Sequence, residues 1–268
     1  MLCCLLVSNI ALAAKHTHRH INKKEHWFSH TERGHFEVIG ALGAAQLNAG
    51  NSRLGVTSSE TDTLVQTNSN QWDTLAAQLG AGYVYNIHFK GQYTGQVKWL
   101  SSIEPELNVY HLASNSIKGD VWRFNSAAFN ELTYDIPLHS TRLMLDGALT
   151  IATWQRLSVY AIGGIGNAWN RVGYSDTDND SDSISPCPEQ RLKLNSNTSA
   201  HFAWEVGAGL IYAANNRIGV SVEYLYTDLG RVSTSANGNA GTTTAPMIVP
   251  ARFRLKSNQG FIGLHVAL

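Results

Sequence analysis

Residues 261–268 read Phe-Ile-Gly-Leu-His-Val-Ala-Leu, and every second residue of this carboxyl-terminal stretch is Ile, Leu or Val. Successive side chains of a β-strand point to opposite faces, so these four residues share one face. The other face carries Gly263 and His265 among its members. The stretch therefore predicts a strand that separates an apolar environment from a more polar one, and its meaning depends on how often the pattern recurs.

Seven earlier segments show the same two-residue period, at about residues 36–45, 74–87, 99–112, 138–153, 157–171, 200–213 and 218–227. Charged residues fall on one face wherever the phase is clear, as where Val222 and Tyr224 lie opposite Glu223, but the phase of the glycine-rich segment 157–171 is ambiguous. Long polar connections at about 47–73, 113–137, 173–199 and 230–250 alternate with short ones near 154–156 and 215–216. This pattern predicts an all-β fold, an eight-stranded antiparallel up-and-down transmembrane β-barrel with short periplasmic turns and long extracellular loops.

Aromatic residues lie near the expected strand ends, where they would form two girdles at the bilayer interfaces. These residues are Tyr83, Tyr85, Trp99, Trp154, Tyr160, Trp169, Trp204, Tyr212, Tyr224 and Tyr226.

The amino terminus predicts export. Residues 1–13 form a largely apolar run that ends in Ala11-Leu12-Ala13, the small-x-small pattern of a signal-peptidase site. We therefore expect a signal peptide over 1–13 that is cleaved near Ala13, a histidine-rich periplasmic leader over 14–34, and an outer-membrane barrel over 35–268.

Composition narrows the possible functions. The formal net charge is zero, so the chain has no basic field to attract nucleic acid. Two of the three cysteines lie in the expected signal peptide, which leaves Cys187 and excludes a disulfide framework within one mature chain. The sequence indicates no cofactor.

Three pieces of the chain carry a family resemblance. Residues 160–166 (YAIGGIG) are similar to a PYxGxGxG strand, with Val159 where proline is common, while 202–209 (FAWEVGAG) and 222–230 (VEYLYTDLG) follow in the expected order. Roughly residues 36–268 thus resemble the small outer-membrane β-barrels of the opacity-protein, OmpA-transmembrane-domain and OmpW type. The resemblance implies an outer-membrane location in a Gram-negative bacterium. Leu268 stands where many relatives present a terminal aromatic residue to the barrel-assembly machinery.

An eight-stranded barrel is just wide enough to be filled by its own side chains, which argues against an open pore. Charges removed from bulk water need partners, because unpaired burial is costly. The strand phases therefore predict a polar network that fills the lumen and keeps the barrel rigid, with conduction of protons or solutes as the minor alternative. Its expected members are Glu37, Glu104, Glu106, Arg142, Asp146, Glu205, Glu223 and His265.

Two segments are weak candidates for metal binding: Asp176, Asp178 and Asp180, and His16, His18 and His20. The aspartates alternate as in a calcium loop, but Ser181 and Cys187 replace the turn glycine and the bidentate glutamate. The histidines suit zinc or nickel, but no second ligand group is held near them by secondary structure. A hydrated outer loop and a soluble leader are the favoured interpretations, and no metal site is predicted.

The sequence as a whole favours a non-enzymatic protein whose exposed loops act in envelope integrity or adhesion. Expected partners are outer-membrane lipid and lipopolysaccharide, the barrel-assembly machinery and host-surface ligands, and we expect a monomer. One alternative is a narrow OmpW-like conduit for small hydrophobic solutes, which would need an apolar inner stripe. A more distant one is a lipid A-modifying barrel enzyme that uses His111 with Ser114, or His139 with Ser140, as base and nucleophile.

Overall fold

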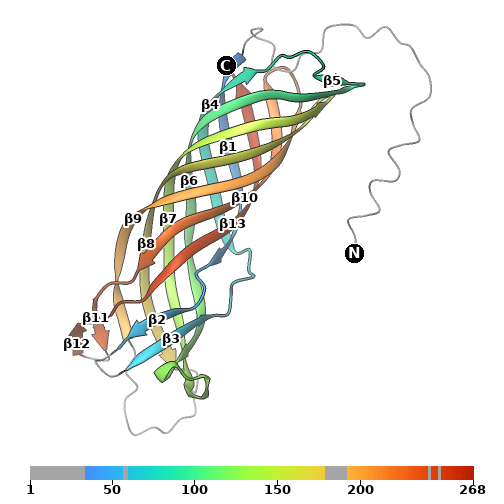
Figure 1. The fold of residues 1–268 in the computed structure, drawn as a ribbon. Helices are drawn as coiled ribbons and strands as arrows, with labels where there is room; N and C mark the ends of the chain where they lie inside the picture. Colours follow the sequence, from blue (N-terminus) through green and yellow to red (C-terminus); the bar gives the residue numbers. More distant parts are fainter. Residues whose placement is uncertain (1–33, 57–59, 179–191, 241–242, 247–248) are drawn as a thin grey trace.

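The computed structural model describes residues 34–56, 60–178, 192–240, 243–246 and 249–268, and shows one antiparallel sheet closed into a barrel (Figure 1). No helix among these residues is long and apolar enough to cross a membrane. Eight long strands form the ring in sequence order. They are β1 (Gly34–Asn48), β4 (Thr74–Asn86), β6 (Val97–Trp122), β7 (Asn130–Trp154), β8 (Leu157–Asp178), β9 (Leu192–Ala213), β10 (Ile218–Ser233) and β13 (Arg252–Ala267).

The carboxyl-terminal strand closes the ring. β13 pairs with β10 on one side and with β1 on the other, so that Ile262 lies between Val222 and Leu42. Each strand of the ring consequently has a hydrogen-bonded neighbour on both sides, and the sheet has no free edge within the ring. The prediction of an eight-stranded antiparallel barrel is confirmed.

The two ends of the barrel differ. The end that holds Gly34 and the carboxyl terminus has the shorter connections, including residues 155–156 and 214–217, and we call it the turn end. The opposite end, here the hairpin end, carries short extra elements (Figure 1). These are β2 (Ser52–Gly55), β3 (Thr61–Gln66), η1 (Arg123–Asn125), η2 (Ala127–Phe129), β11 (Asn237–Ala240) and β12 (Thr243–Pro246), while β5 (Tyr93–Thr94) belongs to the turn end.

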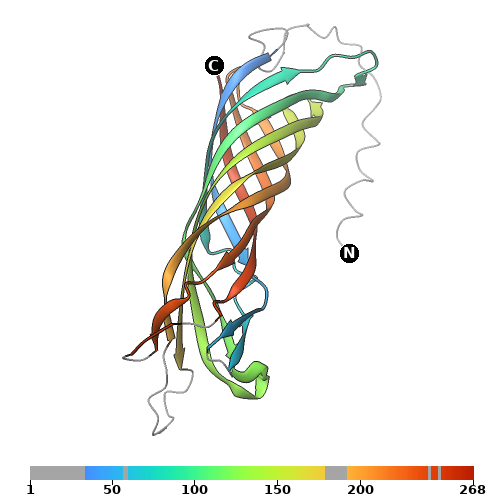
Figure 2. The ribbon, with the colours of Figure 1, turned by 60° about the vertical axis from the view of Figure 1, so that its left-hand side comes forward.

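The strands run well past their predicted limits toward the hairpin end. The sequence predicts loop for residues 113–137, but β6 continues to Trp122 and β7 begins at Asn130. β8 and β9 likewise take up most of the predicted loop 173–199, and β3 pairs with the far part of β6. The hairpin end is therefore a walled extension of the barrel (Figure 2). The outward side chains of its long strands are mostly polar, which is why the sequence there resembles a loop.

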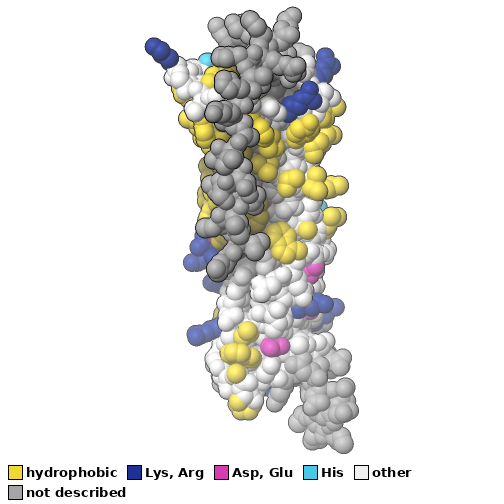
Figure 3. Space-filling view, turned by 90° about the vertical axis from the view of Figure 1, so that its right-hand side faces the viewer, with side chains coloured by type: hydrophobic (Ala, Val, Ile, Leu, Met, Phe, Trp, Pro, Cys, Tyr) yellow, Lys and Arg dark blue, Asp and Glu magenta, His cyan; other side chains and the backbone are white. Residues whose placement is uncertain are grey.

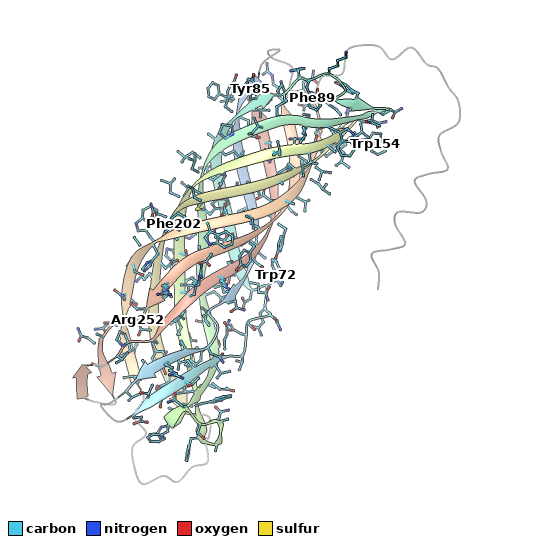
Figure 4. All side chains as sticks on the ribbon, viewed as in Figure 1. Trp72, Tyr85, Phe89, Trp154, Phe202 and Arg252 are labelled. Atoms are coloured by element: carbon cyan, nitrogen blue, oxygen red, sulfur yellow. The ribbon has the colours of Figure 1, made fainter. Side chains whose placement is uncertain are left out.

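Outward side chains form an apolar belt around the part of the barrel nearer the turn end. Leu42, Val222 and Ile262 are 65%, 59% and 67% exposed, which confirms the predicted phase of their strands. Figure 3 shows this belt with Lys and Arg side chains beyond it. In Figure 4, Tyr85, Phe89 and Trp154 lie toward the turn end, and Phe202 and Trp72 lie at a second level further along the barrel. An apolar belt between two aromatic levels is the pattern of a transmembrane barrel.

Tyr160 is a correction to the predicted girdles. The structure places it inside the barrel, buried, where its hydroxyl donates to Oε2 of Glu223 at 2.9 Å. The error follows from the ambiguous phase of the glycine-rich strand: the even-numbered residues of β8, such as Ile162 and Asn170, face inward.

The interior changes character along the barrel axis. At the level of the belt the charged and amide side chains face inward together with apolar ones such as Met144, Ile162 and Phe261, whereas in the extension the inward side chains are mostly apolar. The buried apolar residues of the extension include Leu54, Leu64, Ile117, Val121, Tyr134, Ile136, Val172, Leu194, Leu229, Val232, Phe253 and Leu255. The extension thus has a core like that of a water-soluble β-sheet protein, and the belt section has the inverse arrangement.

The inverted belt makes a direct prediction. Val222→Arg, which places a charge on the lipid-facing surface, should lower the free energy of unfolding in liposomes by about 2 to 4 kcal/mol if Val222 lies near the bilayer midplane. Thr177→Arg on the exposed face of β8 in the extension is the matched control and should change it little. Urea titrations that give equal losses for both variants would contradict this placement of the membrane.

Candidate functional site

Arg142 of β7 is the central cation of the belt-level interior. Its Nε donates to Oε2 of Glu205 at 3.0 Å, and its Nη2 donates to Oε1 of Gln259 at 3.0 Å. Its guanidinium carbon lies 3.9 Å from the centroid of the Tyr110 ring. These partners stand on β9, β13 and β6. Arg142 therefore connects four walls of the barrel across its interior.

A second group of hydrogen bonds centres on Asp146, which lies on the same inner face of β7 as Arg142, four residues further along the strand. Its Oδ2 accepts from Nδ2 of Asn108 at 2.8 Å and from the hydroxyl of Tyr110 at 3.2 Å. The Asn108 amide nitrogen also donates to Oε2 of Glu106 at 2.8 Å. Tyr110 thus joins this group to the contacts of the central arginine.

A third group includes the closing strand. Nδ1 of His265 lies 2.7 Å from Oε1 of Glu37 on β1, and its Nε2 lies 3.0 Å from the hydroxyl of Ser221 on β10. One side chain of β13 therefore contacts both neighbouring strands, and it reinforces the seam where the ends of the sheet meet.

The structure places all eight predicted lumen residues on the inner face. Seven are buried, and Glu104 is half-buried with its Oε1 enclosed. The charges of these eight residues are unequal, because six carboxylates face one arginine and one histidine, and a second histidine, His35, is buried on the same face of β1 as Glu37. Neutral side chains supply further hydrogen bonds. Those that the predicted network omits are Gln78, Asn108, Tyr110, Tyr160, Ser221, Thr227 and Gln259.

Some of the omitted hydrogen-bond partners could be predicted from the sequence and others could not. Asn108 and Tyr110 fall on the predicted inner face, so strand alternation alone indicates them. Gln259 precedes the predicted limit of the last strand, and its inward position becomes visible only when β13 is known to begin at Arg252.

Glycines on the inner face give the larger polar side chains room. Gly164 pairs with Asp146, and Gly80 pairs with Asn108, across adjacent strands. A Cβ atom on either glycine would collide with the side-chain oxygen of its partner. The glycines of β8 and β4 are therefore part of the network, because they allow a side chain to lie flat over the neighbouring backbone.

A buried carboxylate also organises the extension. Oδ1 of Asp176 accepts from the backbone N–H of Leu192 at 2.7 Å, and its Oδ2 accepts from the hydroxyl of Tyr174 at 3.2 Å. Burial raises the pKa of Asp176 to about 6, against the lowering effect of these two hydrogen bonds. Asp176 thus links the end of β8 to the start of β9.

This position corrects the hydrated loop expected around the alternating aspartates. Residues up to Asp178 belong to β8, and both oxygens of Asp176 are used in the hydrogen bonds above. Asp180 lies outside the described residues, as do the predicted signal peptide and His16, His18 and His20. Within the described part of the chain, no three His, Cys, Asp or Glu side chains gather in a way that could hold a metal ion.

The candidate catalytic pairs are not brought together. Ser140 is buried on the inner face, whereas His139 is exposed. The ring of His139 packs against that of His111, with centroids 4.7 Å apart, and Nδ1 of His111 lies 3.1 Å from the hydroxyl of Thr141. Among the described residues, no hydrogen bond joins His111 to Ser114.

The closed barrel, its apolar belt and its polar lumen agree with the sequence comparison. The family described as outer membrane protein beta-barrel domain matches residues 36–253. This chain belongs to that family. An outer-membrane location in a Gram-negative bacterium follows. Since such barrels have short periplasmic turns, the turn end faces the periplasm and the hairpin end faces the outside of the cell.

Three solved structures of outer-membrane barrels are similar to this one. Neisserial surface protein A is 12% identical, with 87% of this chain and 97% of that chain covered and a TM-score of 0.38. The outer membrane protease OmpT from Escherichia coli is 9% identical, with 87% of this chain and 97% of that chain covered and a TM-score of 0.42. OprG from Pseudomonas aeruginosa is 17% identical, with 88% of this chain and 97% of that chain covered and a TM-score of 0.40. No curated protein matches the sequence.

The pairing of Arg142 with Glu205 can be measured by a double-mutant cycle. Arg142→Met leaves a buried carboxylate without its cation and should destabilise the barrel by about 3 to 5 kcal/mol. Arg142→Met combined with Glu205→Gln should recover part of this loss, because the unpaired charge is removed. Unfolding free energies in detergent micelles give the comparison, and strictly additive single losses would contradict the coupling.

The outer extension should respond to pH through Asp176. Its pKa is about 6 when folded, against an ordinary value of 3.8, so the folded extension binds the proton more readily. Stability of the extension should therefore rise as the pH falls through the window between these two values. Hydrogen exchange at the Leu192 amide, corrected for intrinsic rates, should show this rise.

Two variants isolate the titration of Asp176. Asp176→Asn keeps an acceptor for the Leu192 amide but cannot titrate, so the pH dependence of its protection should flatten. Asp135→Asn, on the partly exposed outer face of β7, should retain the wild-type dependence. The same pH dependence in the wild type and Asp176→Asn would contradict the assignment.

Proposed function

We propose that this protein is a non-enzymatic surface protein of the outer membrane, in which a closed barrel anchors a rigid extracellular platform for adhesion. The observation that carries the proposal is the change of interior along the axis, from a cross-linked polar lumen to an apolar core beyond the membrane. The first favours an anchor over a pore, and the second gives the exposed end a fixed shape.

The lumen contacts support a closed barrel. Arg142, Tyr110 and Met144 are among the largest fully buried side chains, and Arg142 spans the interior to three other strands. The apolar interior of the extension meets this polar network at the outer border of the belt. A conduit for hydrophobic solutes would need an apolar stripe through the same section, so the observations favour the platform.

The platform carries an open cleft of about 530 Å³ at the hairpin end. Its walls come from β2, β3, the segment before β13 and the first residue of β13, and the backbone N–H of Gly55 donates to the carbonyl of Val249 at 2.9 Å. Arg53 and Arg252 both line the cleft. Two cations on a fixed backbone suit an anionic ligand on a host surface. The lining residues are Asn51, Ser52, Arg53, Thr63, Val249, Pro250 and Arg252.

The proposal includes the route to the membrane and the assembly state. Residues 1–13 would direct export as a signal peptide cleaved near Ala13, and residues 14–34 would remain as a periplasmic leader. The barrel-assembly machinery would insert the chain, which then acts as a monomer.

A loop deletion tests the adhesive role. The backbone N–H of Thr234 donates to the carbonyl of Ala251 at 3.0 Å, and the N–H of Ala251 donates to the Thr234 hydroxyl at 3.1 Å. Removal of residues 235–250, with an Asn-Gly turn in their place, should therefore keep the β10–β13 register and heat-modifiable folding. Binding of expressing cells to epithelial cells and matrix-coated wells should be lost.

Two further measurements sharpen this test. Arg53→Gln with Arg252→Gln should reduce binding while the whole loop remains, whereas Lys118→Gln with Lys193→Gln removes the same charge elsewhere on the extension and should not. The refolded wild-type protein should be silent in planar bilayers. Stable single-channel currents, or full binding by the loop deletion, would refute the platform.

A further inference from the structure

Three basic residues meet on the outer wall of the barrel between β10 and β13. We call Arg231, Arg254 and Lys256 the wall patch. Arg231 and Arg254 are directly opposite each other across the two strands, while Lys256 lies opposite Asp228. Both arginines are exposed and the lysine is half-buried. Like charges directly opposite each other are unfavourable in a sheet, so this arrangement favours an anionic partner.

The wall patch has a surplus of positive charge. Among the described residues, Asp228 is the one carboxylate in an ion pair with it: Nε of Arg254 lies 2.6 Å from Oδ2 of Asp228. Oδ1 of Asp228 accepts from the backbone N–H of Gly230 at 3.0 Å, within a β-bulge where Gly230 has a φ of +84°. Asp228 thus fixes the backbone and orients Arg254, and two of the three cations remain unbalanced.

The wall patch begins where the aromatic level ends. On the same two strands the hydroxyl of Tyr224 donates to Oδ1 of Asn258 at 2.7 Å, and Tyr226 pairs with Asn258 and packs against Trp204 with ring centroids 5.6 Å apart. Trp72 lies over neighbouring Gly260. Asn258 therefore marks the outer border of the apolar belt.

The distance of the wall patch from Asn258 along the barrel axis indicates which part of the membrane the patch contacts. Lys256 and Arg254 follow Asn258 at two-residue steps toward the hairpin end, so with a rise of about 3.3 Å per residue and a tilt of about 40° they lie roughly 5 and 10 Å beyond the border. The polar headgroup region of one leaflet is about 5 to 8 Å thick. Lys256 therefore lies within the headgroup layer, and the long side chains of Arg254 and Arg231, which start at its outer edge, can extend back into it, whereas Arg252 stands further out (Figure 4).

We propose that the wall patch binds the phosphate groups of lipid A, the membrane-anchored part of lipopolysaccharide, in the outer leaflet. Arginine forms paired hydrogen bonds with phosphate oxygens, and lysine adds a compact charge. The aromatic side chains next to the patch would contact the start of the acyl chains of the same lipid. This site faces the membrane and is distinct from the outer cleft, so it does not depend on an adhesive role.

Binding of fluorescent diphosphoryl lipid A to the refolded full-length protein in neutral detergent tests the site. Arg231→Gln with Lys256→Gln should weaken binding about thirty-fold, because each basic side chain near an anionic surface contributes about a fivefold factor. Arg254 is left in place because it pairs with Asp228. Lys118→Gln with Lys193→Gln, which removes two exposed cations further out, should bind like the wild type.

Two comparisons separate phosphate binding at the wall patch from a folding defect and from contact with the acyl chains alone. Arg231→Lys with Lys256→Arg keeps the charge and should retain binding within about threefold, so that loss in the glutamine variant is not a folding defect. Dephosphorylated lipid A should bind the wild type as weakly as the glutamine variant binds the phosphorylated lipid. Undiminished binding by the glutamine variant would overturn the proposal, as would full competition by millimolar inorganic phosphate, which would indicate a site for soluble anions.

Discussion

Backbone hydrogen bonding inside the bilayer is the constraint on which this structure depends. The hydrocarbon core offers no water, so each amide N–H and carbonyl at that depth must be paired within the protein. A sheet meets this requirement only when it has no edge, and β13 removes both edges by pairing with β1 and β10. The contact of His265 with Glu37 and Ser221 lies at the same seam, so side chains reinforce the closure that the backbone requires.

Closure with eight strands fixes the interior volume, and the interior must then be filled. Alternation sends every second side chain inward, and in the belt these include all of the network's charged groups. An excess of carboxylates over cations requires neutral donors, and Asn108 and Tyr110 supply two of them to Asp146. Gly164 leaves space for that carboxylate on the adjacent strand. The inward charged residues and the inward glycines of the sequence are thus related, because the glycines leave the space that the charged side chains occupy.

Most of the membrane section could be predicted from the sequence, because lipid imposes a rule on every outward position. Val222 and Glu223 are assigned correctly by alternation alone. The sequence does not define the phase of segment 157–171, because its glycines remove the contrast between faces, and the predicted girdle therefore places Tyr160 on the wrong side. The predicted site contains six lumen carboxylates, Arg142 and His265, but omits His35, which is buried on the same face of β1 as Glu37, and Gln259, whose segment lacks apolar outward neighbours.

The sequence does not predict the strands of the extension, and the physical reason also explains why the extension is stable. Beyond the membrane the outward face meets water, so polar side chains there carry no penalty and the strands of residues 113–137 look like loop. The hydrophobic effect, which has little to act on between a barrel wall and lipid, again becomes the main driving force, and it acts inward on residues such as Ile117, Ile136 and Leu255. The same continuous strands are therefore held by two opposite side-chain arrangements, and the transition between them falls at the headgroup layer. At that level neither an apolar nor a fully hydrated surface is matched to its surroundings, and a wall that carries arginine and lysine beside tyrosine and tryptophan suits both.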